Sequence, residues 1–190
     1  MISSLVVSFV LSPLLIAIAI MIKIDSRGPI IFKHKRVGYK GKTFYLYKFR
    51  SMVDNAEELI KSFTPEQQKE WKKNYKLEHD PRITKVGSFL RKTSLDELPQ
   101  LFNIIGGSLS VVGPRPVIGE ELDKYGANKL KFLSVKPGLT GYWACHGRSN
   151  TTYDERMKME LYYVDHASIS LDLKIIFKSI FSVLKKEGAK

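Results

Sequence analysis

The first 22 residues contain no charged side chain, and this run constrains the chain more than any other feature. The run ends at Lys23 and is long enough to cross a bilayer as one straight helix. A cleavable signal peptide is the weakest interpretation, because no basic residues precede the apolar stretch. Ser12 and Pro13 interrupt the run near its middle. A plain span and a broken helix both place the chain on a membrane.

The Ser12–Pro13 pair gives the broken helix a physical cause. Proline has no amide N–H, so it frees a helix carbonyl and kinks the helix, and the hydroxyl of Ser12 can hydrogen-bond a freed carbonyl. A helix broken at its middle could enter and leave the membrane by the same face. Composition alone favours the plain span, because proline is common in membrane helices.

Cations follow the apolar run at once, which suits anionic lipid headgroups and predicts that this side is cytoplasmic. Gly28–Pro29 marks a turn. Residues 30–32 and 43–49 read as two short strands around a turn at 38–42, so a β-hairpin is predicted. The cations are Lys23, Arg27, Lys33, Lys35 and Arg36.

Residues 91–116 carry the groups best suited to phosphate chemistry. Asp96 and Glu97 are adjacent carboxylates that closely follow Arg91, and Arg115 lies between two prolines. Fixed cations neutralise phosphoryl oxygens, one carboxylate can hold a divalent metal, and a second can act as a nucleophile.

A structural interpretation of the same carboxylates remains open. Ser94 and Glu97 fit a capping box, in which Glu97 would only tie back a helix N-terminus. Pro99 would then fall at the fifth helical position, where its missing N–H removes a hydrogen bond. A helix that starts at Asp96 places Pro99 in the first turn and keeps the Asp96 carboxylate ionised through the helix dipole.

The rest of the chain reads mainly as helices. In the glycine-rich loop 135–149, glycines could let backbone N–H groups approach a phosphate, but the spacing matches neither of the common nucleotide-binding motifs. Cys145 and His146 are adjacent and suggest a thiol nucleophile, which we disfavour because neighbouring side chains rarely point at one another. The remaining predicted elements are an amphipathic helical stretch over 54–77 with a second start at Pro65 after Thr64, a helix over 86–92, a buried strand over 108–113, and helices over 119–133 and 153–164.

The last segment, residues 168–186, has apolar residues at helical spacing and lysines on other faces. Such a helix can pack in a core or lie in the membrane interface, and the apolar N-terminus favours the interface.

Composition limits the partners. Thirty-one Lys and Arg against nineteen Asp and Glu give a net charge of +12, which points to polyanions: nucleic acid, anionic lipid or phosphorylated substrates. No nucleic-acid-binding motif is visible, so nucleic acid is not expected. A single cysteine excludes an internal disulfide, and one cysteine with four scattered histidines gives no zinc-ligand spacing.

In order along nearly the whole chain, a set of short motifs resembles the bacterial sugar transferases, which are monotopic phosphoglycosyl transferases. Each motif is weak by itself, but the ordered set is specific. The motifs cover residues 12–13, 25–32, 48–52, 94–103, 112–116, 136–141, 147–149 and 171–174.

The resemblance implies a chemistry and its residues. The family transfers a sugar 1-phosphate from a nucleotide sugar, usually a UDP-sugar, first to an enzyme carboxylate and then to undecaprenyl phosphate, releasing UMP in the first half-reaction. It implies Asp96 as the nucleophile and Glu97 as a Mg²⁺ ligand. It also implies a re-entrant helix broken at Ser12–Pro13, which reverses the ranking from composition. The matching phosphate- and nucleotide-binding arginines are Arg91, Arg115 and Arg148, and Asp172 matches an acidic active-site position.

The physics agrees with this division of roles. Neighbouring helical residues point about 100° apart, so Asp96 and Glu97 cannot flank one bond as glycosidase carboxylates do. One can act at the metal and the other at phosphorus.

The chain departs from the family pattern at two places. Relatives often carry a pair of basic residues and an acidic residue before the apolar run, whereas this chain starts within the run. We therefore expect either that the chain is truncated or that its membrane anchor is shorter. Ala144 stands where many relatives have Gln, which puts the contacts of that Gln in doubt. Unlike in the long galactose- and glucose-transferring relatives, no large multi-span domain is expected before the catalytic part.

We therefore expect an α/β (α+β), mostly helical, membrane-associated chain with a re-entrant membrane helix over 1–22 and a cytoplasmic catalytic domain over 23–190. Amphipathic interface helices and a small β-hairpin complete the expected fold. The expected place is the cytoplasmic face of the bacterial inner membrane, in contact with its anionic lipids, with oligomers allowed. The alternative is a non-catalytic, basic membrane-surface adaptor.

Overall fold

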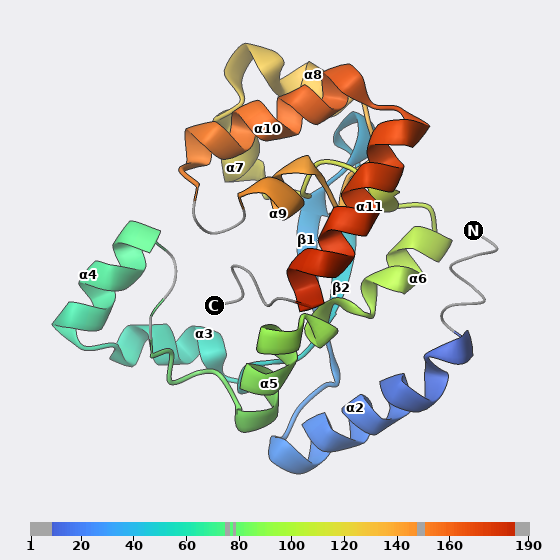
Figure 1. The fold of residues 1–190 in the computed structure, drawn as a ribbon. Helices are drawn as coiled ribbons and strands as arrows, with labels where there is room; N and C mark the ends of the chain where they lie inside the picture. The colour runs from blue at the N-terminus through green and yellow to red at the C-terminus, as the bar shows by residue number, and fades with distance from the viewer. Residues whose placement is uncertain (1–8, 75–76, 78, 148–150, 185–190) are drawn as a thin grey trace.

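The computed structural model describes residues 9–74, 77, 79–147 and 151–184, which form a mixed α/β (α+β) structure that is mostly helical (Figure 1). Within these residues, two small sheets lie among the helices. The helices are α2 (Ser12–Asp25), α3 (Ala56–Leu59), α4 (Pro65–Asn74), α5 (Lys85–Thr93), α6 (Gln100–Ile105), α7 (Gly119–Asp123), α8 (Lys129–Phe132), α9 (Tyr142–His146), α10 (Tyr153–His166) and α11 (Ile169–Leu184). The strands are β1 (Ile31–Val37), β2 (Thr43–Phe49), β3 (Ser110–Val112) and β4 (Gly138–Thr140), and the 3₁₀ helices are η1 (Tyr39–Gly41), η2 (Ile60–Ser62), η3 (Leu95–Glu97) and η4 (Gly126–Asn128).

Helix α2 begins at the predicted break. Residues 9 and 10 are helical, Leu11 is a turn residue, and α2 starts at Ser12 with Pro13 in its first turn. The hydroxyl of Ser12 donates to the carbonyl oxygen of Phe9 at 2.7 Å. This is the carbonyl that the missing N–H of Pro13 leaves free, since a helix pairs residue i with residue i−4. The contact of the Ser12 hydroxyl is therefore confirmed, and the break of a membrane helix at this pair stays a prediction.

One side of α2 packs on the protein. Ile18 and Ile22 are buried against Phe49 of β2 and Leu90 of α5. Within the described part of the chain, no helix combines the length and apolar character needed to cross a membrane. The re-entrant membrane helix is thus not confirmed, and it stays a prediction.

The predicted hairpin is confirmed. β1 and β2 pair antiparallel, with Ile31 opposite Phe49. Helix α6 is fixed to this hairpin through Asn103, whose side chain accepts a hydrogen bond from the N–H of Tyr47 at 3.0 Å and donates one to the carbonyl of Tyr45 at 2.8 Å. The segment that carries Asp96 and Glu97 is thereby held between α5, α6 and the hairpin.

The predicted buried strand over 108–113 contains β3, which pairs in parallel with β4 from the glycine-rich loop. Glycine is required here because the backbones approach closely. A Cβ on Gly138 would lie 2.1 Å from the backbone nitrogen of Gly113. The N–H of Gly113 donates to the carbonyl of Thr140, and that of Gly138 donates to Pro114. These N–H groups hold the strands together, so the suggestion that the loop glycines approach a phosphate is wrong for Gly138.

Local signals account for several helix ends. Thr64 caps α4: its hydroxyl accepts a hydrogen bond from the N–H of Gln67, as its position before Pro65 predicts. The predicted single helix over 119–133 is wrong. It divides into α7, η4 and α8, because Gly126 has a φ of +49°, which does not fit a right-handed helix.

Helix α11 packs on the second sheet with one side. Ile175 is buried among Val112, Cys145 and Tyr163. Part of the segment 168–186 therefore packs in the core, which is one of the two interpretations of its sequence. Its opposite side is exposed.

Candidate active site

Asp96 and Glu97 lie in a tight turn between two helices. Helix α5 ends at Thr93, Ser94 adopts a left-handed conformation with a φ of +57°, and η3 follows directly. Ser94 makes no side-chain capping bond. The carboxylate of Glu97 instead accepts a hydrogen bond from the ammonium of Lys48 at 2.6 Å. The capping-box interpretation is therefore wrong, and Glu97 points to the hairpin.

Asp96 is buried, with 9% of its surface exposed. Burial raises the pKa of the Asp96 carboxyl above its ordinary value, and the charge of Lys48 opposes this rise. The neighbouring carboxylate of Glu97 adds to the rise in pKa, and the guanidinium of Arg91 opposes it. We expected a helix N-terminus to keep Asp96 ionised, but the residue lies inside a 3₁₀ turn and burial dominates. Nearby cations, rather than a helix dipole, favour its ionised form.

Lys48 is a functional candidate that the sequence analysis did not assign. It lies in β2 beside the buried Phe49, contacts Glu97, and is the cation with the largest effect on Asp96. Its sequence signal was present, because it opens the 48–52 motif and alternation along a strand points it away from Phe49. What the sequence did not show is that β2 faces the turn of Asp96.

Arg91 occupies the last turn of α5. Its Nε donates a hydrogen bond to the hydroxyl of Ser51 at 2.9 Å, and its charge acts on Asp96. The structure thus brings two of the predicted site residues together, with Ser51 fixing the guanidinium.

A narrow cleft with a cavity volume of about 30 Å³ lies alongside this turn, and both Glu97 and Arg115 line it. Arg115 lies in the loop between β3 and α7, and its guanidinium is 5.7 Å from the ring centre of Trp143. Among the described residues, Asp96, Arg91 and Asp172 do not line the cleft. The lining residues are Arg36, Leu46, Lys48, Glu97, Gln100, Gly113, Arg115, Pro116, Gly138, Leu139, Thr140, Gly141, Trp143, Ala144 and Glu160.

Besides Glu97, the cleft contains a second carboxylate, Glu160 of α10, to which the sequence analysis gave no role. Glu160 is 1% exposed and accepts a hydrogen bond from the backbone N–H of Arg115 at 3.1 Å. Burial raises its pKa to about 7. Its signal in the sequence is the spacing of Arg156, Glu160 and Tyr163, which places all three on one face of a helix.

One predicted site residue, Asp172, lies away from the cleft. Asp172, in the first turn of α11, accepts a hydrogen bond from the hydroxyl of Tyr163 at 2.8 Å. Arg148 lies outside the described residues. Ala144, which stands where many relatives have Gln, lines the cleft.

Cys145 and His146 do contact each other, at 3.3 Å between Sγ and Nδ1, so our reason for disfavouring a thiol nucleophile was wrong. Cys145 is nevertheless buried in the cluster with Val112 and Ile175. Burial in apolar surroundings disfavours the thiolate, which is the reactive form.

A divalent metal fits this site only together with a phosphorylated ligand. Among the described residues, no three His, Cys, Asp or Glu side chains gather into a group that could hold a metal. Mg²⁺ is usually bound through one or two carboxylates plus substrate phosphates and water. Glu97 supplies one carboxylate at the cleft, which meets that pattern.

Known proteins resemble this chain along almost its full length. The family model described as bacterial sugar transferase matches residues 1–186. The chain is 45% identical to the undecaprenyl-phosphate galactose phosphotransferase of Salmonella typhimurium over 98% of this chain and 40% of that protein. It is 43% identical to the exopolysaccharide production protein ExoY of Sinorhizobium fredii, over 94% of this chain and 80% of that protein. It is 37% identical to a UDP-N-acetylgalactosamine-undecaprenyl-phosphate N-acetylgalactosaminephosphotransferase of Aeromonas hydrophila, over 94% of this chain and 41% of that protein. The chain therefore spans about 40% of the length of the Salmonella relative.

Proposed function

This chain belongs to the bacterial sugar transferase family, and on that premise we propose that it transfers a sugar 1-phosphate from a UDP-sugar to undecaprenyl phosphate. One observation carries the proposal: a buried carboxylate, Asp96, lies in the field of Lys48 and Arg91, next to a cleft that Glu97 and Arg115 line. Carboxylate nucleophiles act on phosphorus when cations reduce the repulsion from the phosphoryl oxygens.

In the first half-reaction, a carboxylate oxygen of Asp96 attacks the phosphorus that bears the sugar. The bond from that phosphorus to the bridging oxygen breaks, and UMP leaves with the bonding electron pair. In the second half-reaction, a phosphate oxygen of undecaprenyl phosphate attacks the same phosphorus. The acyl phosphate bond breaks, and Asp96 is restored as a carboxylate.

The other side chains prepare the nucleophile and hold the donor. Lys48 favours the ionised form of Asp96 and orients Glu97 through their 2.6 Å contact. Arg115 is exposed at the cleft, where its guanidinium can bind diphosphate oxygens bidentately. Glu97 would hold Mg²⁺, which when bound neutralises charge on the diphosphate.

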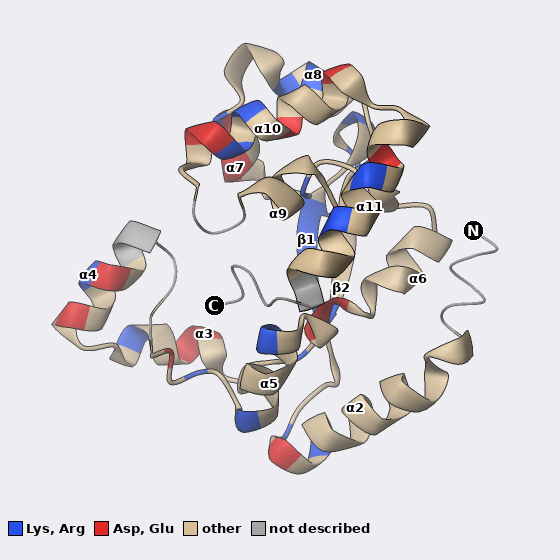
Figure 2. Ribbon diagram, in the orientation of Figure 1, with Lys and Arg blue, Asp and Glu red and all other residues tan. Residues whose placement is uncertain are grey.

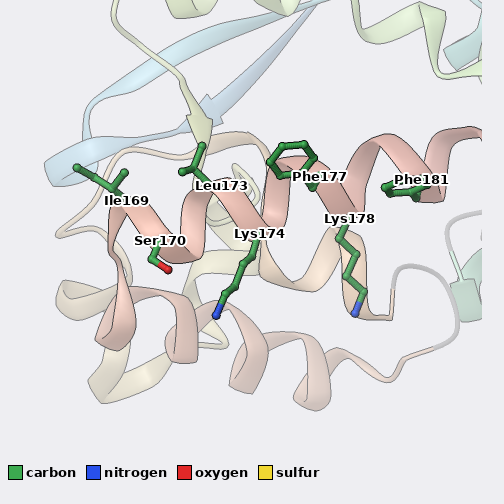
Figure 3. Close-up of a pocket in the computed structure, with 7 residues that line it drawn as sticks. All are labelled: Ile169, Ser170, Leu173, Lys174, Phe177, Lys178 and Phe181. Carbon is green, nitrogen blue, oxygen red and sulfur yellow. The ribbon is translucent and has the colours of Figure 1, made fainter.

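We further propose that α2 and α11 place the chain on the cytoplasmic face of the bacterial inner membrane. Figure 2 shows that the charges of α2 lie only at its C-terminal end. Five large apolar residues on the outer side of α11 are 51–82% exposed. Lys174 and Lys178 lie beside Ile169, Leu173, Phe177 and Phe181 of this set (Figure 3). Apolar surface bordered by lysines suits the boundary between acyl chains and anionic headgroups. The five residues, which we term the α11 apolar face, are Ile169, Leu173, Phe177, Ile180 and Phe181.

This same face supports a second candidate, a membrane-surface adaptor without catalysis. The two functions differ in what Asp96 does. An adaptor needs lipid contact and charge but not a particular carboxylate.

The test is UMP release by detergent-solubilised protein supplied with undecaprenyl phosphate, Mg²⁺ and a panel of UDP-sugars. We include both galactose and N-acetylgalactosamine donors, because the names of the relatives differ in the sugar. Release should occur with one donor, should stop with EDTA, and should fall by roughly 10³-fold or more in Asp96→Asn.

The matched control is Glu120→Gln, which neutralises an exposed carboxylate of α7 and should keep wild-type turnover. Full turnover in Asp96→Asn, with covalent labelling by the donor retained, would exclude the proposed mechanism. Folded protein that releases no UMP from any donor would favour the adaptor.

A further inference from the structure

Glu160 of α10 is a buried acid at the wall of the cleft. Its side chain is 1% exposed, and it lines the same cleft as Glu97 and Arg115. The mechanism above gives it no role. An acidic side chain in this position is unexpected, because the other charged residues of the cleft, apart from Glu97, are cations.

The two carboxyl oxygens of Glu160 differ in their surroundings. Oε1 accepts the backbone N–H of Arg115 at 3.1 Å and lies 4.0 Å from Nε of Arg156. This contact fixes the loop that presents the Arg115 guanidinium. Oε1 therefore has a structural function that is already satisfied.

Oε2 is buried and has no hydrogen-bond partner among the residues that the structure describes. It lies 4.0 Å from the place that a Cβ on Gly141 would occupy, and Gly141 also lines the cleft. A buried polar atom without a partner is costly, and native proteins rarely retain one without a ligand or water to satisfy it. The unpaired oxygen therefore lies at the wall of the cleft, beside Gly141.

The chemistry of the cleft indicates which group of the donor this oxygen meets. Phosphate oxygens only accept hydrogen bonds when ionised, and the cations Arg36, Lys48 and Arg115 suit them. A carboxyl oxygen suits a hydrogen-bond donor such as a hydroxyl group. The pKa of about 7, raised by burial, keeps part of Glu160 uncharged at neutral pH and limits repulsion of the diphosphate.

We propose that Oε2 of Glu160 accepts a hydrogen bond from a hydroxyl group of the nucleotide-sugar donor, while Oε1 holds the backbone of Arg115 in place. The inference rests on the proposed function, since it assigns a contact to that donor. The ribose and the transferred sugar both offer such a hydroxyl.

The first experiment compares wild type, Glu160→Gln and the control Glu120→Gln in UMP release. Glutamine keeps an acceptor for the N–H of Arg115 but places an amide NH₂ at Oε2, which cannot accept. The KM for the donor should rise roughly tenfold in Glu160→Gln, a loss of the size of one hydrogen bond, with kcat changed much less. A KM equal to that of wild type overturns the inference while leaving the proposed function standing.

UMP and its 2′- and 3′-deoxy analogues, and deoxy-sugar donors, identify the source of the hydroxyl. Weaker binding of UMP itself by Glu160→Gln assigns the contact to the ribose, and unchanged UMP binding with a raised donor KM assigns it to the sugar. Wild type should discriminate against one deoxy compound, and Glu160→Gln should lose that discrimination.

If Glu160→Gln does not fold, the deoxy series on wild type still decides. Equal binding of every deoxy compound overturns the inference. Wild-type protein that releases no UMP from any donor overturns the proposed function, and the inference with it.

Discussion

Lys48 lies at the centre of the charge balance around Asp96. As the proposed nucleophile, Asp96 must be ionised, yet burial raises its pKa and the carboxylate of Glu97 raises it further. Lys48 opposes both effects and is paired directly with Glu97. A single lysine thus influences the ionisation of one carboxylate and the orientation of the other.

Replacing Lys48 by Gln should therefore change the pH dependence of catalysis as well as its rate. Without the cation the pKa of Asp96 rises further, so the acid limb of the kcat–pH profile should move to higher pH. At neutral pH we expect a loss of roughly 10²- to 10³-fold. Steady-state UMP release from pH 5 to 9 measures this, with Lys48→Arg restoring the position of the limb. An unchanged pH profile in Lys48→Gln would contradict the assigned role.

Glu160 should also make the stability of the fold depend on pH. In the unfolded chain the carboxyl releases its proton near the ordinary pKa of 4.5, whereas burial keeps the proton on the folded protein up to about pH 7. Between these values the folded state binds more protons, so raising the pH destabilises it. The contribution lost is on the order of 3 kcal/mol.

Urea unfolding between pH 4.5 and 8 tests this prediction. The stability of wild type should fall relative to that of Glu160→Gln as the pH rises through this window, because glutamine does not titrate. Parallel pH profiles for the two proteins would show that Glu160 is not the group responsible.

At the scale of single elements, α2 and α11 have the same design. Each buries a narrow side, with Ile18 and Ile22 in one and Ile175 in the other, and exposes apolar residues on the rest. A patch of this kind is rare on the surface of soluble proteins unless it meets a partner or a membrane. The exposed apolar sides of both helices support the proposed membrane contact.

Polar substitutions on the α11 apolar face should weaken membrane binding without unfolding the chain. For the pair Leu173→Gln and Phe177→Gln we expect roughly 10- to 100-fold weaker partition into lipid vesicles, since each side chain loses apolar burial. Vesicle flotation measures the partition. Leu130→Gln, at an 83% exposed position on α8, is the matched control and should bind as wild type does. Equal binding by the double variant would argue against this face as the lipid contact.

For the molecule as a whole, the excess of cations adds an electrostatic contribution to the apolar one. The net charge of +12 should favour anionic membranes, at about 1 kcal/mol for each Lys or Arg close to the surface. Figure 2 shows these cations spread over many elements, so only part of them can meet one membrane plane.

Binding to vesicles that contain anionic lipid should therefore weaken by roughly tenfold or more between 50 and 300 mM salt, because salt screens surface charge. Binding to neutral vesicles should be weaker and nearly independent of salt. Flotation over this salt range checks both. If binding to anionic vesicles does not depend on salt, the prediction is wrong and the apolar faces alone account for the affinity.

Local chemistry explains what the sequence by itself determined. The contact of the Ser12 hydroxyl with the carbonyl of Phe9, the cap at Thr64 and the hairpin between residues 31 and 49 each depend on neighbouring residues, and the structure confirms all three. The family followed from an ordered series of short motifs, and the family model confirms it over residues 1–186.

Only the tertiary structure decided which side chains meet. Lys48 and Glu97 are 49 residues apart in the chain, and Arg115 and Glu160 are 45 residues apart. No local pattern encodes these pairs, because each depends on how a strand, a turn and a helix pack together. The same packing places Asp96 in a buried 3₁₀ turn instead of at a helix N-terminus, and burial, a property of the whole fold, then sets the direction of its pKa shift.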